Sequence, residues 1–577
     1  MGGLWGFFQT SIAAGPAQSK VTVTIEGLEK LPLKNVRSSL SLEQQKNNPR
    51  LSESRIQSLH RDAPEEIRRA LQALGYYRPE IRTDLQHAGE QWSARYQVNP
   101  GPAVPVREFE IVLRGEGRDD KPFQEAVKEF PLKKGDVLRH DHYDSGKKRL
   151  LQIAAERGYF DAQFTRHEIQ VNLAAYEARG WLHFDTGPRY RFGKVEFPET
   201  PLEPEVLQRL TPFKEGDPYE TAKLLALQDA LTNSDYFDNV EVLPQREAGV
   251  IDKVPIQVRL EARKRHYFAG GVGFSTDTGP RLTADWEARY INRHGHRVKA
   301  ELDISPVWSE LSGHYIIPGY PGFTGERDAQ LEITAHALRK DTDTSKGTSG
   351  QAGVAHTWNL LGWNQTLSLS YLLEDFEVGD TSDTSQLVMA GAGWRRTVTD
   401  DPLFTTHGWR ASLDLQGAHD SLLSDVSLAR LRFNGKYIHS LTPRDRLIAR
   451  GDLGAMLVSD FDKLPPLLRF FAGGDVSIRG FDFEELGPKD DSGDVIGGRY
   501  LAVGSLEYEH YFLEKWGGAV FVDAGNAFND LGDGVAYGVG VGVRWRSPIG
   551  LVRGDVAMGS FDGATTFRFH LVLGPDL

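Results

Sequence analysis

Two short segments in the C-terminal half place a charged side chain among glycines and aromatic residues. The first consists of Ser477, Ile478, Arg479, Gly480 and Phe481; its region begins as a strand at Phe470 and continues as a loop rich in glycine and charge to Tyr500. The second contains Phe521, Asp523 and Gly525, with Asp523 on the polar side of a strand pattern. A glycine-rich loop can enter a water-filled space, and an arginine at its tip offers a fork of donors that a carboxylate accepts in bidentate fashion. These residue types therefore suit an ion pair that orients a loop.

Other clusters of reactive residue types give weaker signals. Metal-like types occur at His140, Asp141, His142 and Asp144, and again at His294 and His296. The first group lies where polar helix caps are expected and the second on a turn, and the sequence places no further ligand beside either. A Gly-x-Ser-x-Gly nucleophile elbow is absent, and the glycines from Gly538 to Gly542 lack the dinucleotide-binding spacing. We therefore expect no enzyme activity, no metal site and no cofactor.

The composition excludes several classes of function. The chain has 577 residues, no Cys and a formal net charge of -13. Without Cys it has no disulfide, thiolate zinc site, Fe–S cluster or thiol nucleophile. An acidic chain without a basic block does not neutralise phosphates, so we expect no nucleic-acid binding. No run of about 20 consecutive apolar residues occurs, which excludes a transmembrane helix but leaves open a membrane-spanning β-barrel.

The N-terminal half contains three repeats. In each, an apolar helical pattern is followed by a small or polar residue and two aromatics, which are Gly75-Tyr76-Tyr77, Gly158-Tyr159-Phe160 and Asp235-Tyr236-Phe237. Each repeat is patterned as strand, helix, helix, strand, strand. Gly158 suits the left-handed position that ends a helix, whereas Asp235 stands where glycine is expected. We predict α+β domains at residues 20–100, 101–187 and 188–263, after a signal remnant or disordered segment at 1–19.

These repeats have two interpretations. As plain spacer domains they carry no chemistry of their own. As presenters of sheet edges they can capture an extended polypeptide through main-chain hydrogen bonds, which tolerates variety in the captured sequence.

From about His266 helical periodicity gives way to alternation. Leu282, Ala284, Trp286, Ala288 and Tyr290 alternate with polar residues, and Tyr537, Val539, Val541, Val543 and Trp545 alternate with glycine and arginine. Alternation over such a length, with aromatics near segment ends, favours a transmembrane antiparallel barrel over a soluble sandwich. At about 10 residues per strand, the region accommodates about 12 to 18 strands. We predict that residues 264–577 form this barrel.

The three repeats resemble POTRA domains, and the motifs at 477–481 and 521–525 are similar to the paired motifs of the Omp85 superfamily. The resemblance covers nearly the whole chain after residue 20. The three repeats, the segment from Leu464 to Phe481 and the ending from Leu573 to Leu577 are most similar to the TamA branch, the outer-membrane subunits of translocation and assembly modules. This resemblance implies a 16-stranded barrel in the bacterial outer membrane, with POTRA domains in the periplasm.

The resemblance also implies roles for the charged residues. The loop that carries Arg479 would fold into the lumen, where Arg479 contacts the inner wall at Asp523. We expect this pair to be partly solvated, so that it orients the loop more than it stabilises the barrel. Arg544 and Asp555 share the inner face and could extend the network, although generic lining of the lumen is the preferred interpretation.

A barrel that helps another protein to insert needs a weak seam, because a fully closed barrel has no free edge. The first strand, His266 to Ser275, contains three glycines that make few cross-strand contacts. The last strand, Thr565 to Leu573, is followed by a glycine that permits a bend and a proline that lacks a backbone donor. We predict a lateral opening between these strands. The seam residues are Gly270, Gly271, Gly273, Gly574 and Pro575.

These features lead to a function in outer-membrane protein assembly, with insertion and secretion of clients such as autotransporters through the seam. The resemblance implies an inner-membrane-anchored partner of the TamB type on the first POTRA domain, besides unfolded clients and lipid. One alternative is a polypeptide export pore of the two-partner secretion type, which typically carries two repeats and a plug helix. The other is a passive channel, which should lack both the repeats and the paired motifs.

Overall fold

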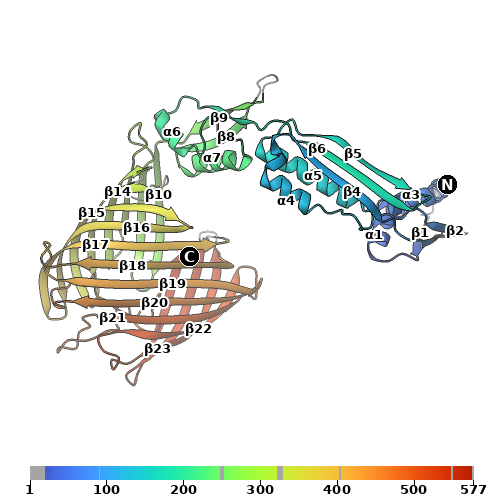
Figure 1. The fold of residues 1–577 in the computed structure, drawn as a ribbon. Helices are drawn as coiled ribbons and strands as arrows, with labels where there is room; N and C mark the ends of the chain where they lie inside the picture. Colours follow the sequence, from blue (N-terminus) through green and yellow to red (C-terminus); the bar gives the residue numbers. More distant parts are fainter. Residues whose placement is uncertain are drawn as a thin grey trace, which may run out of the picture. The chain divides into compact units, whose positions relative to one another are not determined.

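The computed structural model describes residues 20–89, 91–246, 252–320, 322, 329–401, 404–547 and 550–574. Two sequence expectations, the N-terminal segment 1–19 and Pro575, lie outside these residues. Within them, three small sheets and one closed barrel follow one another along the chain (Figure 1).

The first sheet has the order β1-β3-β2. Its elements are β1 (Lys20–Glu26), α1 (Lys30–Ser39), α2 (Ser41–Gln45), α3 (Glu53–Gln72), β2 (Glu80–Ala88) and β3 (Gln91–Asn99). Central strand β3 buries every second residue, as a half-buried strand requires. Helix α3 begins after Ser52, whose side chain accepts a hydrogen bond from the N–H of Arg55, and it buries Ile56, Leu59 and Ala63 at helical spacing.

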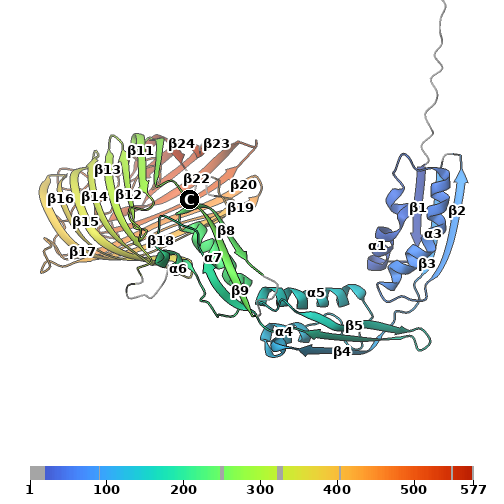
Figure 2. The ribbon, with the colours of Figure 1, turned by 90° about the horizontal axis from the view of Figure 1, so that it is seen from above.

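The second and third sheets repeat this order. The second contains β4 (Val106–Arg114), η1 (Glu116–Asp119), α4 (Lys121–Lys128), α5 (His140–Arg157), β5 (Gln163–Asn172) and β6 (Glu177–Asp185). The third contains β7 (Arg191–Glu196), α6 (Pro204–Leu210), α7 (Thr221–Asn233), β8 (Phe237–Pro244) and β9 (Lys253–Ala262). In the second domain, residues of α4 and α5 share one buried cluster with strands β4 and β6, and Figure 2 shows α5 running along this sheet. The expected α+β repeats are therefore confirmed.

The ends of two repeat helices follow the sequence prediction. Gly158 ends α5 in the left-handed conformation, and Asp235 adopts φ +62° in the corresponding place after α7. An aspartate tolerates this conformation better than most residues, because its short polar side chain bonds locally. None of the described helices is both long and apolar enough to cross a bilayer.

Sixteen antiparallel strands close into a barrel, as expected. They are β10 (His266–Ser275), β11 (Gly279–Ala288), β12 (Arg297–Ile304), β13 (Trp308–Pro318), β14 (Gln330–Asp341), β15 (Ser345–Leu360), β16 (Trp363–Val378), β17 (Thr381–Thr399), β18 (His407–Ala418), β19 (Leu428–Thr442), β20 (Asp445–Val458), β21 (Tyr500–His510), β22 (Trp516–Phe528), β23 (Ala536–Ser547), β24 (Gly550–Phe561) and β25 (Ala564–Gly574). The barrel forms one compact unit with residues 198–211 and 229–240 of the third repeat.

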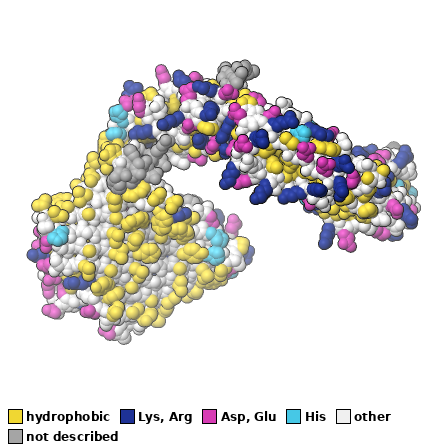
Figure 3. Space-filling model, viewed as in Figure 1, with side chains coloured by type: hydrophobic (Ala, Val, Ile, Leu, Met, Phe, Trp, Pro, Cys, Tyr) yellow, Lys and Arg dark blue, Asp and Glu magenta, His cyan; other side chains and the backbone are white. Residues whose placement is uncertain are grey.

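The two faces of the barrel wall differ in chemistry. Outward-facing apolar side chains such as Val272, Val541 and Phe567 are at least half exposed, and they cover the outer wall visible in Figure 3 (yellow). The neighbouring inward positions carry polar or small residues. This alternation is what a wall between lipid and a polar lumen requires.

The first and last strands meet along a short seam. Strand β10 pairs with β11 along its full length, from His266 opposite Ala288 to Ser275 opposite Gly279. Its pairing with β25, among the described residues, is limited to Ser275 opposite Val572. Gly574, which the sequence analysis placed after the last strand, instead continues β25 and pairs with Leu551 of β24.

Candidate functional site: the lumen loop and the seam

The connection between β20 and β21, residues 459–499, packs against the inner side of the wall. We call it the lumen loop. Its Ile478 and Phe481 are buried in one cluster with wall residues such as Leu372 and Leu501. The expectation that this segment begins as a strand at Phe470 is wrong. Phe470 forms only an isolated bridge to Gly498, within the loop itself.

Arg479 binds Asp523 in bidentate fashion. Its Nε lies 2.8 Å from Oδ2 and its Nη2 2.9 Å from Oδ1, and its backbone N–H donates to Oδ2 at 3.1 Å. Arg479 is 2% exposed and Asp523 is 0% exposed. The expected partial solvation is therefore wrong, because Arg479 is enclosed by the ring of Phe521 and by further charged side chains of the wall.

The pair belongs to a larger buried charge network. Arg479 Nη1 also donates to Glu507 at 2.7 Å and to Asp555 at 3.1 Å. Arg544 donates to the other oxygens of the same two carboxylates, at 2.5 Å each, and to Glu509 at 2.9 Å. Generic lumen lining, our preferred interpretation for Arg544 and Asp555, is therefore wrong. Both are central members of the network, and their partners Glu507 and Glu509 lie on β21.

Two further arginines border this network. Arg446 donates to Glu509 at 2.8 Å, and Arg450 lies 3.6 Å from Asp523. The four carboxylates thus face four arginines. Such balance is needed because an uncompensated charge in a water-poor interior costs several kcal/mol.

The other residues of the two motifs allow the lumen loop to pack closely against the barrel wall. The guanidinium of Arg479 lies 3.3 Å from the centroid of the Phe521 ring, a favourable cation–π position. Ser477 accepts a hydrogen bond from the N–H of Gly473 at 3.2 Å. Gly480 and Gly525 approach the backbone of Gly559 and Ala502 so closely that a Cβ would overlap it. These two glycines are needed for close approach.

Near the seam, the lumen loop contacts the end of β10 and strand β25. Gly270, Gly271 and Gly273 pair with β11. Sequence reasoning missed the polar residues that connect the loop to the seam, namely Asp277, Asp475 and His570. Alternation along β25, where Phe567 and Phe569 are exposed, could have identified His570 as inward-facing, but no sequence signal paired it with a loop residue.

Among the described residues, these three also have the side-chain types that could ligate a metal ion. Their ligand atoms lie within 4.8 Å of one another. Both nitrogens of His570 are already engaged. Nε2 accepts the N–H of Gly480 at 2.9 Å, and Nδ1 lies 2.5 Å from Oδ1 of Asp475. The cluster is therefore built for hydrogen bonds.

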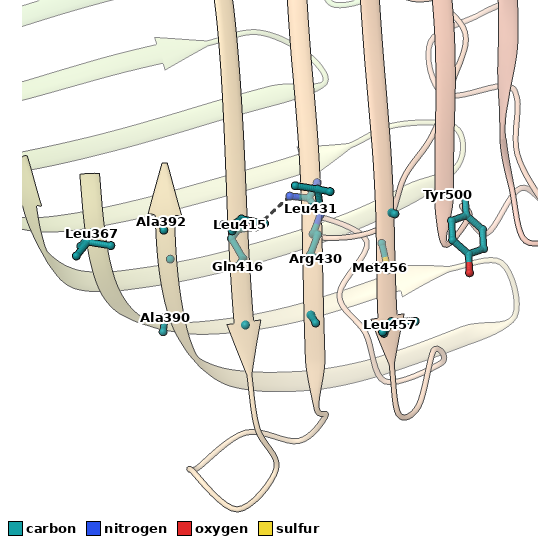
Figure 4. A pocket seen from close by; sticks show the side chains of 14 residues that line it. Leu367, Ala390, Ala392, Leu415, Gln416, Arg430, Leu431, Met456, Leu457 and Tyr500 are labelled. Atoms are coloured by element: carbon teal, nitrogen blue, oxygen red, sulfur yellow. Dashed lines mark hydrogen bonds between the residues drawn. The ribbon is translucent and has the colours of Figure 1, made fainter. Parts of the chain in front are cut away.

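A cavity of about 630 Å³ lies elsewhere, on the wall formed by β16 to β21 (Figure 4). Its lining is mostly leucine, alanine and glycine, for example Leu367, Ala392 and Leu415. Arg430 borders it and donates to Gln416 at 2.9 Å. The cavity contains none of the network or seam residues.

A 16-stranded barrel with a buried Arg479 loop, preceded by three small α+β domains, defines an outer-membrane barrel of the POTRA-bearing class. Family models agree. Residues 327–576 match the Omp85 superfamily domain, residues 22–100 match POTRA domain TamA domain 1, and residues 190–263 match the POTRA model described as surface antigen variable number repeat. The barrel region is thus an Omp85 superfamily domain, and the first domain is a POTRA domain of the TamA type.

Known relatives share the fold and part of the sequence. The chain is 25% identical over 374 residues to outer membrane protein assembly factor BamA of Nitratidesulfovibrio vulgaris, covering 60% of this chain and 46% of that protein. It is 24% identical over 345 residues to the BamA of Neisseria meningitidis, covering 55% and 43%. It thus spans about half the length of these relatives. The crystal structure of Haemophilus ducreyi BamA lacking POTRA domains 1–3 superposes with a TM-score of 0.66 at 19% identity, covering 82% of this chain and 99% of that one.

The family and the fold determine the location. The barrel lies in a bacterial outer membrane, and the POTRA domains lie on its periplasmic side.

Proposed function

We propose that this protein assembles other proteins into the outer membrane, through the seam between β10 and β25. The observation that carries the proposal is the single register pair, Ser275 opposite Val572, that joins these strands. The matched relatives are named as outer membrane protein assembly factors, which supports the same class of activity here.

The limited pairing of β10 with β25 leaves part of the β10 edge open. In hydrocarbon an unsatisfied N–H or C=O costs several kcal/mol, so a partly unpaired strand edge is a reactive surface. A client strand that pairs with β10 satisfies these groups without requiring a particular sequence. Folding of the client then supplies the free energy for its own insertion.

The match of the first domain to the TamA model supports a narrower proposal. In it, the clients include autotransporters, and an inner-membrane-anchored protein of the TamB type docks on the first POTRA domain. The buried lumen loop argues against a passive channel, because Phe470, Ile478 and Phe481 lie buried against the wall in the lumen.

The test is a reversible lock across the seam. Ser275→Cys with Val572→Cys places two thiols on facing positions in a chain that has no other Cys. Oxidation is expected to stop the surface display of an autotransporter client, and a reductant is expected to restore it. The control, Met558→Cys with Phe567→Cys, joins register partners on β24 and β25 away from the seam. Unchanged client display with the oxidised seam pair contradicts the proposal.

A further inference from the structure

We propose that the lumen loop, acting through Asp475, holds the seam shut, and that the seam opens when this residue releases the first strand. We call Ser275, Thr276, Asp277, Asp475 and His570 the seam clasp. The inference deepens the proposed function and rests on the seam being the working opening. Asp475 and His570 act in it as positioning residues.

On the first-strand side, the hydrogen bonds of the described residues converge on Asp475. The hydroxyls of Ser275 and Thr276 donate to its carboxylate at 2.6 and 3.0 Å. Its backbone N–H donates to Asp277 in the turn after β10, at 2.7 Å. The preceding Gly474 lies so close to Asp277 that a Cβ would overlap its carboxylate. The loop therefore fits against this turn at residues 474 and 475.

On the last-strand side, the loop is held by a row of inward-facing residues. Thr566 donates to the carbonyl oxygen of Gly480 at 2.5 Å, and Arg568 binds Asp482. His570 completes the row. Because its Nε2 accepts the N–H of Gly480, the ring proton must lie on Nδ1, which donates to Asp475.

The loop has more contacts with β25 than with β10, which indicates that β10 is the strand that separates from the loop. Three residues of β25 and the buried Arg479 network hold the loop on the side of the last strand. Among the described residues, all hydrogen bonds from the loop to β10 and its turn involve Asp475. Loss of this one residue would free β10 while the loop remains on β25.

Direct bonds between the two strands are too few to replace the clasp. The N–H of Thr276 donates to the carbonyl of Leu571 at 3.2 Å, and the N–H of Leu571 donates to the Thr276 hydroxyl at 3.2 Å. Both lie at the same end of the seam as the one register pair. The charge-assisted bonds to Asp475, which are stronger than neutral ones, carry most of the closure.

The experiment measures the width of the seam in the purified full chain in lipid nanodiscs, without a client. Spin labels on Val272→Cys and Phe569→Cys, both outward-facing, report the β10 to β25 distance by double electron–electron resonance. Asp475→Ala is expected to raise the wide population about tenfold, the effect of losing about 1.4 kcal/mol of closure. Asp482→Ala, which removes a loop contact to β25 only, is expected to leave the distance unchanged.

Two further measurements separate the clasp from general instability. Ser275→Ala with Thr276→Val removes the first-strand donors and keeps the loop charge, so it is expected to widen the seam like Asp475→Ala. Labels on Met558→Cys and Phe567→Cys across β24 and β25 are expected to stay at one distance in all variants. An unchanged seam in both clasp variants, or widening of the β24–β25 pair as well, would overturn the clasp. Because no client is present, failure here is distinct from failure of the proposed function.

Discussion

Arg479 and Arg544 share the carboxylates of Glu507 and Asp555, and this sharing determines what a single substitution does. Removing one cation leaves the carboxylates buried and under-compensated, which is more damaging than removing a whole pair. The buried network is thus expected to stabilise the closed position of the loop as well as to orient it.

Arg479→Ala is therefore expected to lower the free energy of unfolding by about 3–5 kcal/mol. Arg568→Ala, which breaks the exposed pair with Asp482, should cost about 0–1 kcal/mol. Urea unfolding of the barrel in lipid vesicles, followed by tryptophan fluorescence, measures both. Arg479→Lys should not restore the lost free energy of unfolding, because an ammonium group cannot make the bidentate contact with Asp523. Equal effects of the two alanine variants would contradict this account.

The seam clasp should depend on pH. Burial, with Asp475 beside it, raises the pKa of the Asp277 carboxyl from 3.8 to about 7. The closed clasp then binds a proton that the open one releases, so closure is strongest below the open-state pKa and weakens as pH rises toward about 7. The groups that face this site are His570 and Asp475. The cavity around them is lined by Lys436, Arg450, Arg479, Glu507, Arg553 and Asp555.

The wide population of the seam-spanning spin-label pair is accordingly expected to rise between about pH 5 and about pH 7 and to level off above. Asp277→Asn mimics the protonated carboxyl and should give the same narrow distribution throughout. Two results would contradict the role of Asp277. One is a seam distance in the parent protein that does not change with pH, and the other is a seam distance in Asp277→Asn that still changes with pH.

At this scale the sequence predicted the motif residues but not their surroundings. The paired motifs and the resemblance they carry indicated that Arg479 meets Asp523, and the two lie 2.8 Å apart. Glu507 and Glu509 alternate with Leu506 and Tyr508, which shows only that they point inward. Whether an inward charge meets solvent or a counter-charge depends on where the loop packs, and alternation does not encode that.

At the scale of elements, strand β23 provides the surface on which the loop tip rests. A Cβ at Gly538 would overlap the carbonyl oxygen of Arg479, and one at Gly542 would overlap the carboxylate of Asp555. These glycines therefore keep the wall flat where the loop approaches. Their alternation with valine indicated an inward glycine face, whereas the close approach of a loop separated by about 60 residues was not visible in the pattern.

Gly538→Ala is expected to displace the loop tip, whereas Gly504→Ala on β21, which has open space around it, is not. A buried reporter, Ile478→Cys, measures this through its alkylation rate. The rate should rise about tenfold with Gly538→Ala if the methyl group costs the docked loop about 1.4 kcal/mol. The same slow rate in both alanine variants would show that the loop does not need the flat wall.

Strands and loops differed in how well the sequence predicted them. Period-two alternation identified β10 with its observed bounds, because one face meets lipid along its whole length. The apolar residues after Phe470 predicted a strand. In the structure these residues are buried because the loop packs against the wall, and they do not form part of a sheet. Gly574 likewise remains in β25, because its neighbour on β24 provides a pairing partner.

At the scale of the whole molecule, chain length alone allowed about 12 to 18 strands, and the resemblance selected the observed 16. Closure of the barrel depends on contacts that the lumen loop makes with the first strand, β10, and the last strand, β25. These three segments are far apart in the sequence. The glycines of the first strand pointed to a weak seam, but the clasp that holds it required three-dimensional contacts.

The proposed function requires that a client meets the edge of β10, and this contact can be measured by crosslinking. A photoreactive residue at Val272 of β10, compared with one at Leu369 on the outer face of β16, can be activated in cells during synthesis of an outer-membrane client. Adducts with the client are expected at Val272, and few are expected at Leu369. Equal adducts at both positions, or none at Val272, would contradict the proposed function.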